Sequence, residues 1–470
     1  MNNRIIVALC FVLLVLISSP TLGIVYVAPN GSGSGTSWAN PLGTIQAAID
    51  IAAGDQVWVK HGVYYELIML KDNVQVYGGF TGTETMLSQR PPFPRSSDDP
   101  NCSVIDGSGC GSVVTALAGV TSSAVIDGFT ITDGLNYSTG GGGVLCVSSS
   151  PVIRWCKIVD NIADVGAGMY LRNASPTIES NTIACNRADF FGGGISMEFC
   201  SKPTINDNTI CNNDGGYMGG GIDVEGDSAP SIMCNRIDSN IAGFGGGIYT
   251  LSNCAAFQIR ENAIVNNTSI TGGGGGIYCS QSSPIITFNF IEANASISDG
   301  GGIYCYYRSS PIVTNNVIAF NSARQYGGGV FAGQYSIPQL TNNTIARNAT
   351  PKRGGGIALI TGCASPISNN LVAYNTTGIY SYLSKPVLRK NDFFNAGANY
   401  TGITAGLGDI QAFPNFVDSA AGDFRIQQPT PCYNAGWNGA PYMTGNDING
   451  YIRIQAGTID IGAYELPPVN

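Results

Sequence analysis

An asparagine that recurs every 27 residues is the feature that most constrains the fold of this chain. One column of it consists of Asn181, Asn208, Asn235, Asn262, Asn289, Asn316, Asn343 and Asn370. A second column with the same period consists of Asn186, Asn213, Asn240, Asn267, Asn294, Asn321, Asn348 and Asn375. A fixed period of this size is typical of stacked repeats, and one polar residue kept in every copy predicts that its side chains line up.

Each copy of the repeat has the pattern of about three short strands separated by turns. After a Gly-Gly-Gly-Ile corner, apolar residues alternate with others, as at Ile195 and Met197, which is the period of a strand. Stacked copies place parallel strands about 4.8 Å apart, the spacing at which identical amides can hydrogen-bond along a column. We therefore predict an all-β fold, a right-handed parallel β-helix. A disordered Gly/Asn-rich linker is the alternative, and the inward aliphatic column argues against it.

The repeats divide the 470 residues into four parts. These are a signal peptide (1–23), an N-terminal cap with the first coils (24–100), repeats of about 27 residues (101–400) and a C-terminal cap segment (401–470). The first part has the charged start, apolar middle and small-residue end of a secretory signal, so we expect an extracellular or cell-surface protein. We expect a short helix at 44–54 to cover the N-terminal end, and a proline-rich excursion from 90 to 99. No second apolar run is long enough to span a bilayer.

Charge and cysteine content exclude several partners and sites. Only 11% of the residues are charged, the net charge is −9 and the pI is about 4.6, which argues against nucleic acid and anionic membranes as partners. We expect a monomer. Of the 14 cysteines, Cys10 lies in the signal, and no pair has Cys-x-x-Cys metal spacing. Cys102 and Cys110 are the best candidates for a disulfide.

Several motifs resemble known families. The segments Tyr26-Val-Ala-Pro-Asn-Gly-Ser-Gly, Tyr77-Gly-Gly-Phe-Thr-Gly and Asp460-Ile-Gly-Ala-Tyr-Glu465 resemble secreted bacterial β-helix proteins of the pectin-lyase-like superfamily. The Gly-Gly-Gly-Ile and Ile-x-x-Asn pieces resemble the repeats of chlamydial polymorphic outer-membrane proteins. This superfamily contains lyases, hydrolases and non-catalytic surface proteins, so the resemblance implies the fold more firmly than the function.

Outward residues of the first strand in each coil form two columns that carry the candidate site. One column is largely aromatic and includes Tyr170, Tyr249, Tyr278, Tyr304 and Phe331. These rings would either bind sugars or stack on one another for structural reasons. A long, shallow aromatic strip suits an extended glycan better than a small ligand.

Charged residues of the same two columns meet on adjacent coils. They are Arg172, Glu198, Asp223 and Glu225. Crowded carboxylates either raise one another's pKa, which makes a general acid, or share a hard cation such as Ca²⁺, for which Glu198, Asp223 and Glu225 would be the ligands. The plain alternative is a solvated strand face. In polysaccharide lyases that this chain resembles, Ca²⁺ neutralises the sugar carboxylate while a Lys or Arg takes the neighbouring proton. The resemblance implies this role for Arg172 or for Lys202, in the turn after Glu198.

These observations favour an exported β-helix that engages an extended polysaccharide along the first-strand face. If it is catalytic, we expect a Ca²⁺-assisted lyase acting on a uronate polymer rather than a glycoside hydrolase, because the single histidine, His61, lies near the N-terminal cap. The alternative is a non-catalytic surface, adhesion or structural protein, which the regular repeat and the scarcity of long loops would suit.

Overall fold

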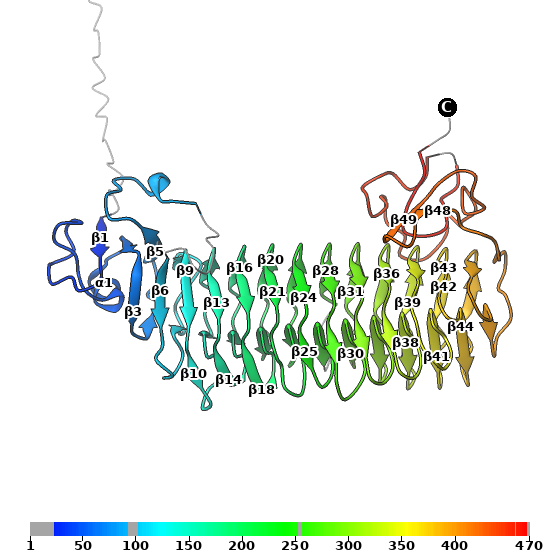
Figure 1. The fold of residues 1–470 in the computed structure, drawn as a ribbon, viewed down its shortest axis with the longest axis horizontal. Coiled ribbons are helices and arrows are strands. Elements are labelled where there is room, and N and C mark those ends of the chain that lie inside the picture. The colour runs from blue at the N-terminus through cyan, green and yellow to red at the C-terminus, as the bar shows by residue number, and fades with distance from the viewer. Residues whose placement is uncertain (1–22, 93–101, 252–255, 456, 468–470) are drawn as a thin grey trace, which may run out of the picture.

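A parallel β-helix forms most of the structure, a computed structural model that describes residues 23–92, 102–251, 256–455 and 457–467. Its strands run across the long axis and repeat along it (Figure 1). Each regular coil contributes one strand to each of three parallel sheets. Sheet 1 follows the glycine corner, sheet 2 follows the next corner, and sheet 3 lies between the two asparagine columns. The predicted architecture of about three short strands per coil is confirmed.

The strands of each sheet are short and pair in sequence order. Sheet 1 contains β4 (Ile68–Met69), β7 (Val114–Ala116), β11 (Val144–Val147), β15 (Met169–Arg172), β19 (Ile195–Glu198), β22 (Ile222–Val224), β26 (Ile248–Leu251), β30 (Ile277–Ser280), β34 (Ile303–Tyr306), β38 (Val330–Gly333), β41 (Ile357–Ile360), β44 (Ile379–Tyr382) and β47 (Tyr400–Thr401). Sheet 2 contains β1 (Ile24–Val27), β2 (Gln56–Lys60), β5 (Gln75–Phe80), β8 (Val125–Asp127), β12 (Val152–Arg154), β16 (Thr177–Glu179), β20 (Thr204–Asn206), β23 (Ser231–Met233), β27 (Gln258–Arg260), β31 (Ile285–Thr287), β35 (Ile312–Thr314), β39 (Gln339–Thr341), β42 (Pro366–Ser368) and β45 (Val387–Arg389). Sheet 3 contains β3 (Gly62–Tyr65), β6 (Ser103–Asp106), β9 (Phe129–Thr132), β13 (Lys157–Val159), β17 (Thr182–Ala184), β21 (Thr209–Cys211), β24 (Arg236–Asp238), β28 (Ala263–Val265), β32 (Phe290–Glu292), β36 (Val317–Ala319), β40 (Thr344–Ala346), β43 (Leu371–Ala373) and β46 (Asp392–Phe394).

Shorter elements complete the coils and the ends. Side strands after the second asparagine column form two small sheets, one with β10 (Leu135–Asn136), β14 (Ile162–Val165) and β18 (Arg187–Phe191), the other with β25 (Ile241–Ala242), β29 (Thr268–Ser269), β33 (Ala295–Ser296) and β37 (Ser322–Ala323). A 3₁₀ helix, η1 (Leu87–Gln89), follows β5, and an antiparallel hairpin, β48 (Phe416–Asp418) and β49 (Asp423–Ile426), lies in the C-terminal segment.

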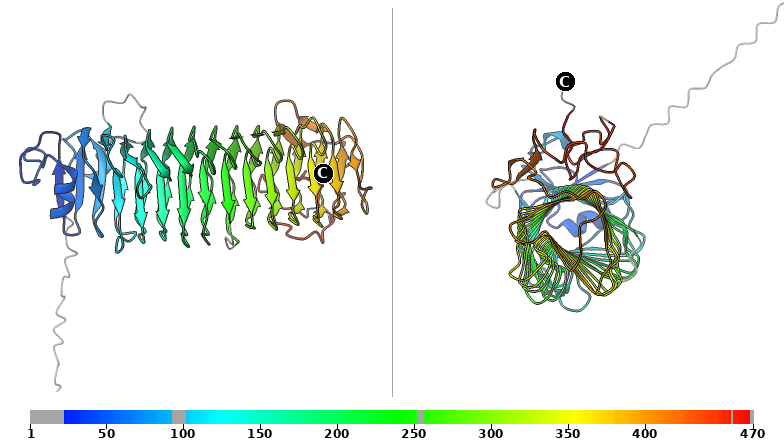
Figure 2. Two further views of the ribbon diagram at one scale, coloured as in Figure 1. Left: turned by 90° about the horizontal axis from the view of Figure 1, so that it is seen from below. Right: turned by 90° about the vertical axis from the view of Figure 1, so that its right-hand side faces the viewer.

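The helix α1 (Ile45–Ile51) covers the N-terminal end of the solenoid, as predicted. Its N-cap is Thr44, whose hydroxyl accepts a hydrogen bond from the amide of Ala47. Ile45 and Ile49 are buried, and α1 contacts β1, β2 and β4. Seen along the axis, the helix lies across the far end of the tube (Figure 2, right). It thereby shields the apolar interior that the first coil would otherwise expose.

Both asparagine columns form continuous hydrogen-bonded ladders. Asn262 is typical: its backbone N–H and its side-chain amide both donate to Oδ1 of Asn289, at 2.9 and 3.0 Å, and its amide also donates to the carbonyl of Ile232. Its own Oδ1 accepts the matching pair from Asn235. These buried side chains satisfy backbone groups at a corner where the chain leaves the sheet, which explains why the position stays asparagine.

The first part of the C-terminal segment lies on the last coil, where Ile403 packs against the core and Leu407 and Ile410 bridge to Arg389 and Asp392. From Phe416 onward the segment folds back against the outer face of sheet 3 instead of covering the far end of the tube (Figures 1 and 2). The reason lies in the sheet itself, because the outward residues Val317, Ala319, Leu371 and Ala373 are apolar and pack against the buried Phe424. This segment buries an apolar flank that a free solenoid would expose to water.

Other predictions meet the structure as follows. Nearly all of the predicted signal peptide (1–23) lies outside the described residues, as does much of the predicted proline-rich excursion (90–99), so both stay predictions. Cys110 has a free thiol, so the predicted disulfide between Cys102 and Cys110 is not formed. Among the described residues, no helix has the length and apolar character needed to cross a membrane. The division into four domains stays a prediction.

Candidate functional site

Three neighbouring strands of sheet 1, β15, β19 and β22, bring the predicted charged residues together. Arg172 on β15 lies directly opposite Glu198 on β19. Asp223 on β22 lies between Ser196 and Tyr249 of the adjoining strands. Parallel pairing in register and alternation of side chains place these groups on the outer face, as the repeat predicted. We call Glu198, Asp223 and Glu225 the carboxylate cluster.

Asp223 is the most unusual member of the carboxylate cluster because only 1% of its surface is exposed. Its Oδ2 accepts a hydrogen bond from the hydroxyl of Ser196 at 2.9 Å, while Oδ1 is buried and has no hydrogen-bond partner among the described residues. The glycine corner passes so close that a Cβ on Gly219 would lie 2.7 Å from that of Asp223. Burial raises the pKa of Asp223 well above its ordinary value, and the charges of Glu225 and Glu198 raise it further. Asp223 therefore holds a proton more tightly than an exposed aspartate does.

Glu225 and Glu198 surround this buried carboxyl group. Glu225 is half-buried, and its backbone N–H donates to the carbonyl of Met197 on β19. Burial raises the pKa of Glu225, and the nearby charge of Glu198 adds to the effect. Tyr170 is buried and hydrogen-bonds Glu198, and its pKa is raised by burial and then by that charge. The arrangement concentrates acidic groups that favour retaining protons.

The sequence left two interpretations of this cluster open, a shared proton and a shared cation. Among the residues that the structure describes, no three His, Cys, Asp or Glu side chains are arranged to hold a metal ion. The joint binding of Ca²⁺ by Glu198, Asp223 and Glu225 therefore stays a prediction. The raised pKa values of Asp223 and Glu225 agree with the general-acid interpretation.

The two predicted basic residues lie at the margin of the carboxylate cluster. Arg172 is exposed, and its guanidinium carbon lies 5.0 Å from the centre of the Phe199 ring, a cation–π contact. Lys202 is exposed in the turn before β20, where its backbone N–H donates to the hydroxyl of Ser175. A role for either residue in proton transfer stays a prediction.

The aromatic column differs from the open platform that the sequence suggested. Tyr249, Tyr278, Tyr304 and Phe331 stack face to face along the axis, with ring centres 4.8 to 4.9 Å apart. Three of the four rings are buried, and Tyr304 is half-buried. Neighbouring rings already cover these faces, which agrees with the structural alternative, and a sugar-binding role for the column stays a prediction. Asp223 precedes Tyr249 in this column and lies at the N-terminal end of the stack.

Sequence reasoning missed two exposed aromatic residues beside the cluster. Phe199, directly after β19, is 52% exposed, and Tyr217, in the loop before the glycine corner, is 50% exposed. Tyr217 packs edge-on against Phe244 and lies close enough to Tyr249 to affect its pKa. Phe199 has a positive φ of 55°, which is uncommon for a bulky residue. Their aromatic character was the only sequence feature that could have indicated these two residues. The alternation of inward and outward positions applies within strands and does not predict the exposure of residues outside them.

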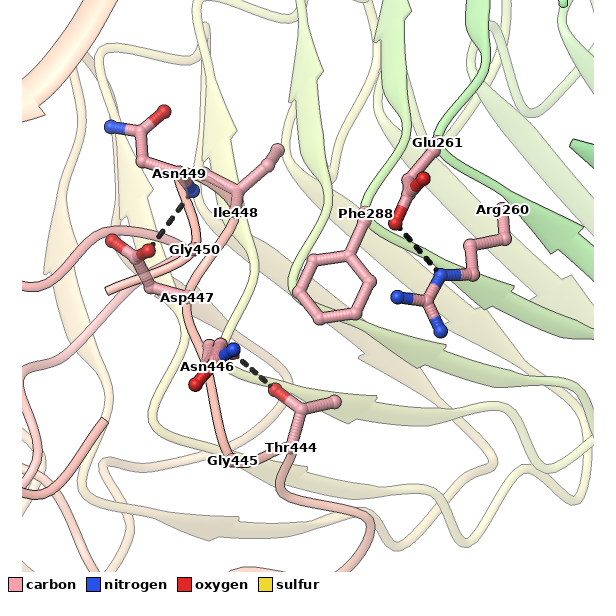
Figure 3. A pocket seen from close by; sticks show the side chains of 10 residues that line it. All are labelled: Arg260, Glu261, Phe288, Thr444, Gly445, Asn446, Asp447, Ile448, Asn449 and Gly450. Atoms are coloured by element: carbon pink, nitrogen blue, oxygen red, sulfur yellow. Dashed lines mark hydrogen bonds and ion pairs between the residues drawn. The ribbon is translucent and has the colours of Figure 1, made fainter. Parts of the chain in front are cut away.

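A separate cavity of about 540 Å³ lies between the C-terminal segment and the flank of the solenoid (Figure 3). Arg260, Glu261 and Phe288 line one side of it, and the loop 444–450 lines the other. Its charged groups are already engaged: Arg260 pairs with Glu261 at 2.9 Å, and the carboxylate of Asp447 accepts a hydrogen bond from the backbone N–H of Asn449. The carboxylate cluster, with its unpartnered buried oxygen, is the stronger candidate for a functional site.

Comparisons with known proteins agree with the fold. Residues 220–409 match the family model described as right handed beta helix region, which confirms the predicted handedness. Similar solved structures include one titled "The complex structure of XylC with xylose" (12% identity, TM-score 0.45, 94% of this chain and 98% of that one) and one titled "Crystal structure of pectate lyase Pel9A" (15% identity, TM-score 0.37, 94% and 96%). No curated protein matches the chain. Residues 27–272, more than half of the chain, match the model described as protein of unknown function (DUF1565), and the chain belongs to that family.

Proposed function

We propose that this protein is exported and binds an extended, largely uncharged polysaccharide across the outer face of sheet 1 at the carboxylate cluster. The observation that carries the proposal is the buried Asp223, whose Oδ1 has no partner and whose pKa is raised beside Glu225 and Glu198. A protonated carboxyl group can donate a hydrogen bond to a sugar oxygen, and ionised carboxylates accept hydrogen bonds from sugar hydroxyls. Exposed Phe199 and Tyr217 flank the cluster and supply apolar contact area.

The charge of the surface favours an uncharged polymer over the uronate polymer expected from the sequence. Three acids occupy the cluster, and the chain has a net charge of −9. A polyanion would bring like charges against these acids, while Arg172 and Lys202 lie at the margin. Neutral sugars avoid this repulsion.

Acid catalysis is the reaction that this site would support if the bound polymer is cleaved. A carboxyl group with a raised pKa keeps its proton at a higher pH than an ordinary one and can protonate the leaving oxygen of a glycosidic bond, with a second carboxylate acting on water or on the sugar. Glu225, which is half-buried, is the candidate for the proton donor, Asp223 is the buried acid beside it, and Glu198 is the candidate second carboxylate. This scheme uses the shared proton and needs no group of three metal ligands.

The experiment is glycan-array binding together with an assay for new reducing ends, both measured for the wild type, Glu225→Gln and Asp223→Asn. Glu179→Gln is the matched control, because this acid lies on sheet 2 and pairs with Arg154 at 3.6 Å. We expect binding of neutral glycans that falls in both site variants and not in the control. Wild-type binding that is absent, or unchanged by both site variants, would contradict the proposal.

A non-catalytic surface or adhesion protein is the second candidate, favoured by the stacked aromatic column. That column rigidifies sheet 1 over four coils without presenting a ring platform. The same assays separate the two functions. Binding without new reducing ends supports the adhesive role, whereas loss of reducing ends in Asp223→Asn supports acid catalysis.

A further inference from the structure

A second pocket lies on the same outer face of sheet 1, at its N-terminal end. It has a volume of about 520 Å³ and is formed between Gln46 of α1 and the first strands β4, β7 and β11. This volume is typical of sites for small molecules or for a group attached to a larger ligand. Nothing in the sequence analysis indicated it, because its walls come from a helix, a turn and three coils.

The pocket and the carboxylate cluster share one column of outward residues. Met69 pairs with Thr115, which pairs with Leu145, and these three residues line the pocket. The column then continues through Tyr170 and Ser196 to Asp223. Leu145 and Asp223 are three strands apart, which corresponds to about 14 Å along the axis. One extended ligand on this face can therefore reach both sites.

The lining of the pocket selects for apolar, uncharged groups. None of the described residues that line it carries a charge, and Leu67 and Met69 expose 44% and 50% of their surfaces. These two side chains would lose unfavourable contact with water on binding an apolar group.

Polar groups in the lining are largely satisfied within the protein. The amide of Asn136 donates to the hydroxyl of Ser112 and to that of Thr139, each at 2.8 Å. Oε1 of Gln46 accepts a hydrogen bond from the backbone N–H of Met69 at 2.6 Å. An unsubstituted sugar placed here would give up hydrogen bonds to water and find few replacements, which is unfavourable.

We propose that this pocket binds an apolar acyl or aryl substituent carried by the polysaccharide that lies across sheet 1. The identity of the carrier rests on the proposed function, whereas the apolar selectivity of the pocket does not. The substituent lies against Leu67, Met69 and Leu145, and the polymer continues from there toward Asp223. The protein then prefers an esterified polymer over the same polymer without esters.

The first test uses a probe that is independent of any glycan. Methyl benzoate, a neutral aryl ester, is added to the full chain, and saturation-transfer NMR detects its binding. We expect a signal with the wild type and its loss in the double variant Leu67→Asn, Met69→Gln. Val63→Asn is the matched control, because Val63 is also 44% exposed but lies on sheet 3. No signal with the wild type, or an equal signal in the double variant, overturns the proposal.

The second test compares oligosaccharides of one neutral polymer with and without a benzoyl ester. An apolar group that fills such a pocket improves binding by about tenfold or more, so we expect this preference in the wild type and its loss in the double variant. Circular dichroism checks that the variants are folded. Equal affinity of the wild type for both oligosaccharides contradicts the proposed carrier. If Asp223→Asn and Glu225→Gln leave both affinities unchanged while the double variant still loses the probe, the proposed function fails and the apolar pocket stands.

Discussion

Replacement of Asp223 by asparagine should change how the stability of the protein depends on pH. Asparagine has nearly the same shape, keeps an acceptor for the hydroxyl of Ser196 and cannot ionise. In the wild type, burial and the neighbouring acids raise the folded-state pKa of Asp223 above its unfolded value. The folded state therefore binds this proton more tightly than the unfolded state does.

The sign and size of the effect follow from this difference. For an acid with a raised folded-state pKa, folding is favoured at low pH, and stability falls as the pH rises from the unfolded pKa, about 3.9, to the folded one. One proton of difference corresponds to about 1.4 kcal/mol of unfolding free energy per pH unit. Asp223→Asn removes this contribution. Between the unfolded and folded pKa values of Asp223, the unfolding free energy of the variant relative to the wild type should therefore rise by up to about 1.4 kcal/mol per pH unit.

The assay is reversible urea unfolding of the wild type, Asp223→Asn and the control Glu179→Gln at a series of pH values above about 4. We expect the unfolding free energy of Asp223→Asn, relative to that of the wild type, to increase with pH. The control Glu179→Gln should show the same pH dependence as the wild type. A difference that stays constant with pH would refute the conclusion that Asp223 is protonated by burial.

Three further predictions concern the framework of the site. Asn262→Ala leaves the amide of Asn235 and the carbonyl of Ile232 without their side-chain partner, so unfolding should require about 2–5 kcal/mol less in urea titrations; no loss would contradict the ladder. Tyr278→Leu removes three ring contacts and should cost about 1.5–4.5 kcal/mol by the same assay while leaving glycan binding intact, and a loss of binding at equal stability would instead give the stack a binding role. Phe424→Ala should loosen the C-terminal segment, with faster proteolysis there than in the repeats, and uniform proteolysis would argue against its separate docking.

Much of the fold follows from the sequence because the coil-to-coil register is set by the repeat. Once Asn181 is placed above Asn208, Arg172 must lie beside Glu198 and Ser196 beside Asp223. Parallel in-register pairing therefore predicts surface neighbours that are 26 or 27 positions apart, which is how the carboxylate cluster was found.

Alternation along a strand could not predict which outward residues are buried. Asp223 and Tyr249 point away from the main core, yet the glycine corner packs against both of them and Tyr278 stacks on Tyr249. That cover depends on how loops between strands fold, which periodicity does not describe. The docking of the C-terminal segment could have been predicted from the sequence. The outer face of sheet 3 carries the charged residues Arg236 and Asp238 in an earlier coil but the apolar residues Val317 and Leu371 in later coils.

The number of protons on the carboxylate cluster is the quantity on which this account depends. Infrared difference spectra between the wild type and Asp223→Asn at a series of pH values report it directly, because a protonated carboxyl group has a carbonyl stretch distinct from that of a carboxylate. The account predicts that a protonated band persists in the wild type above the ordinary pKa of an aspartate, about 3.9, and that Asp223→Asn lacks it. A band of Asp223 that disappears at or below this pH would contradict it.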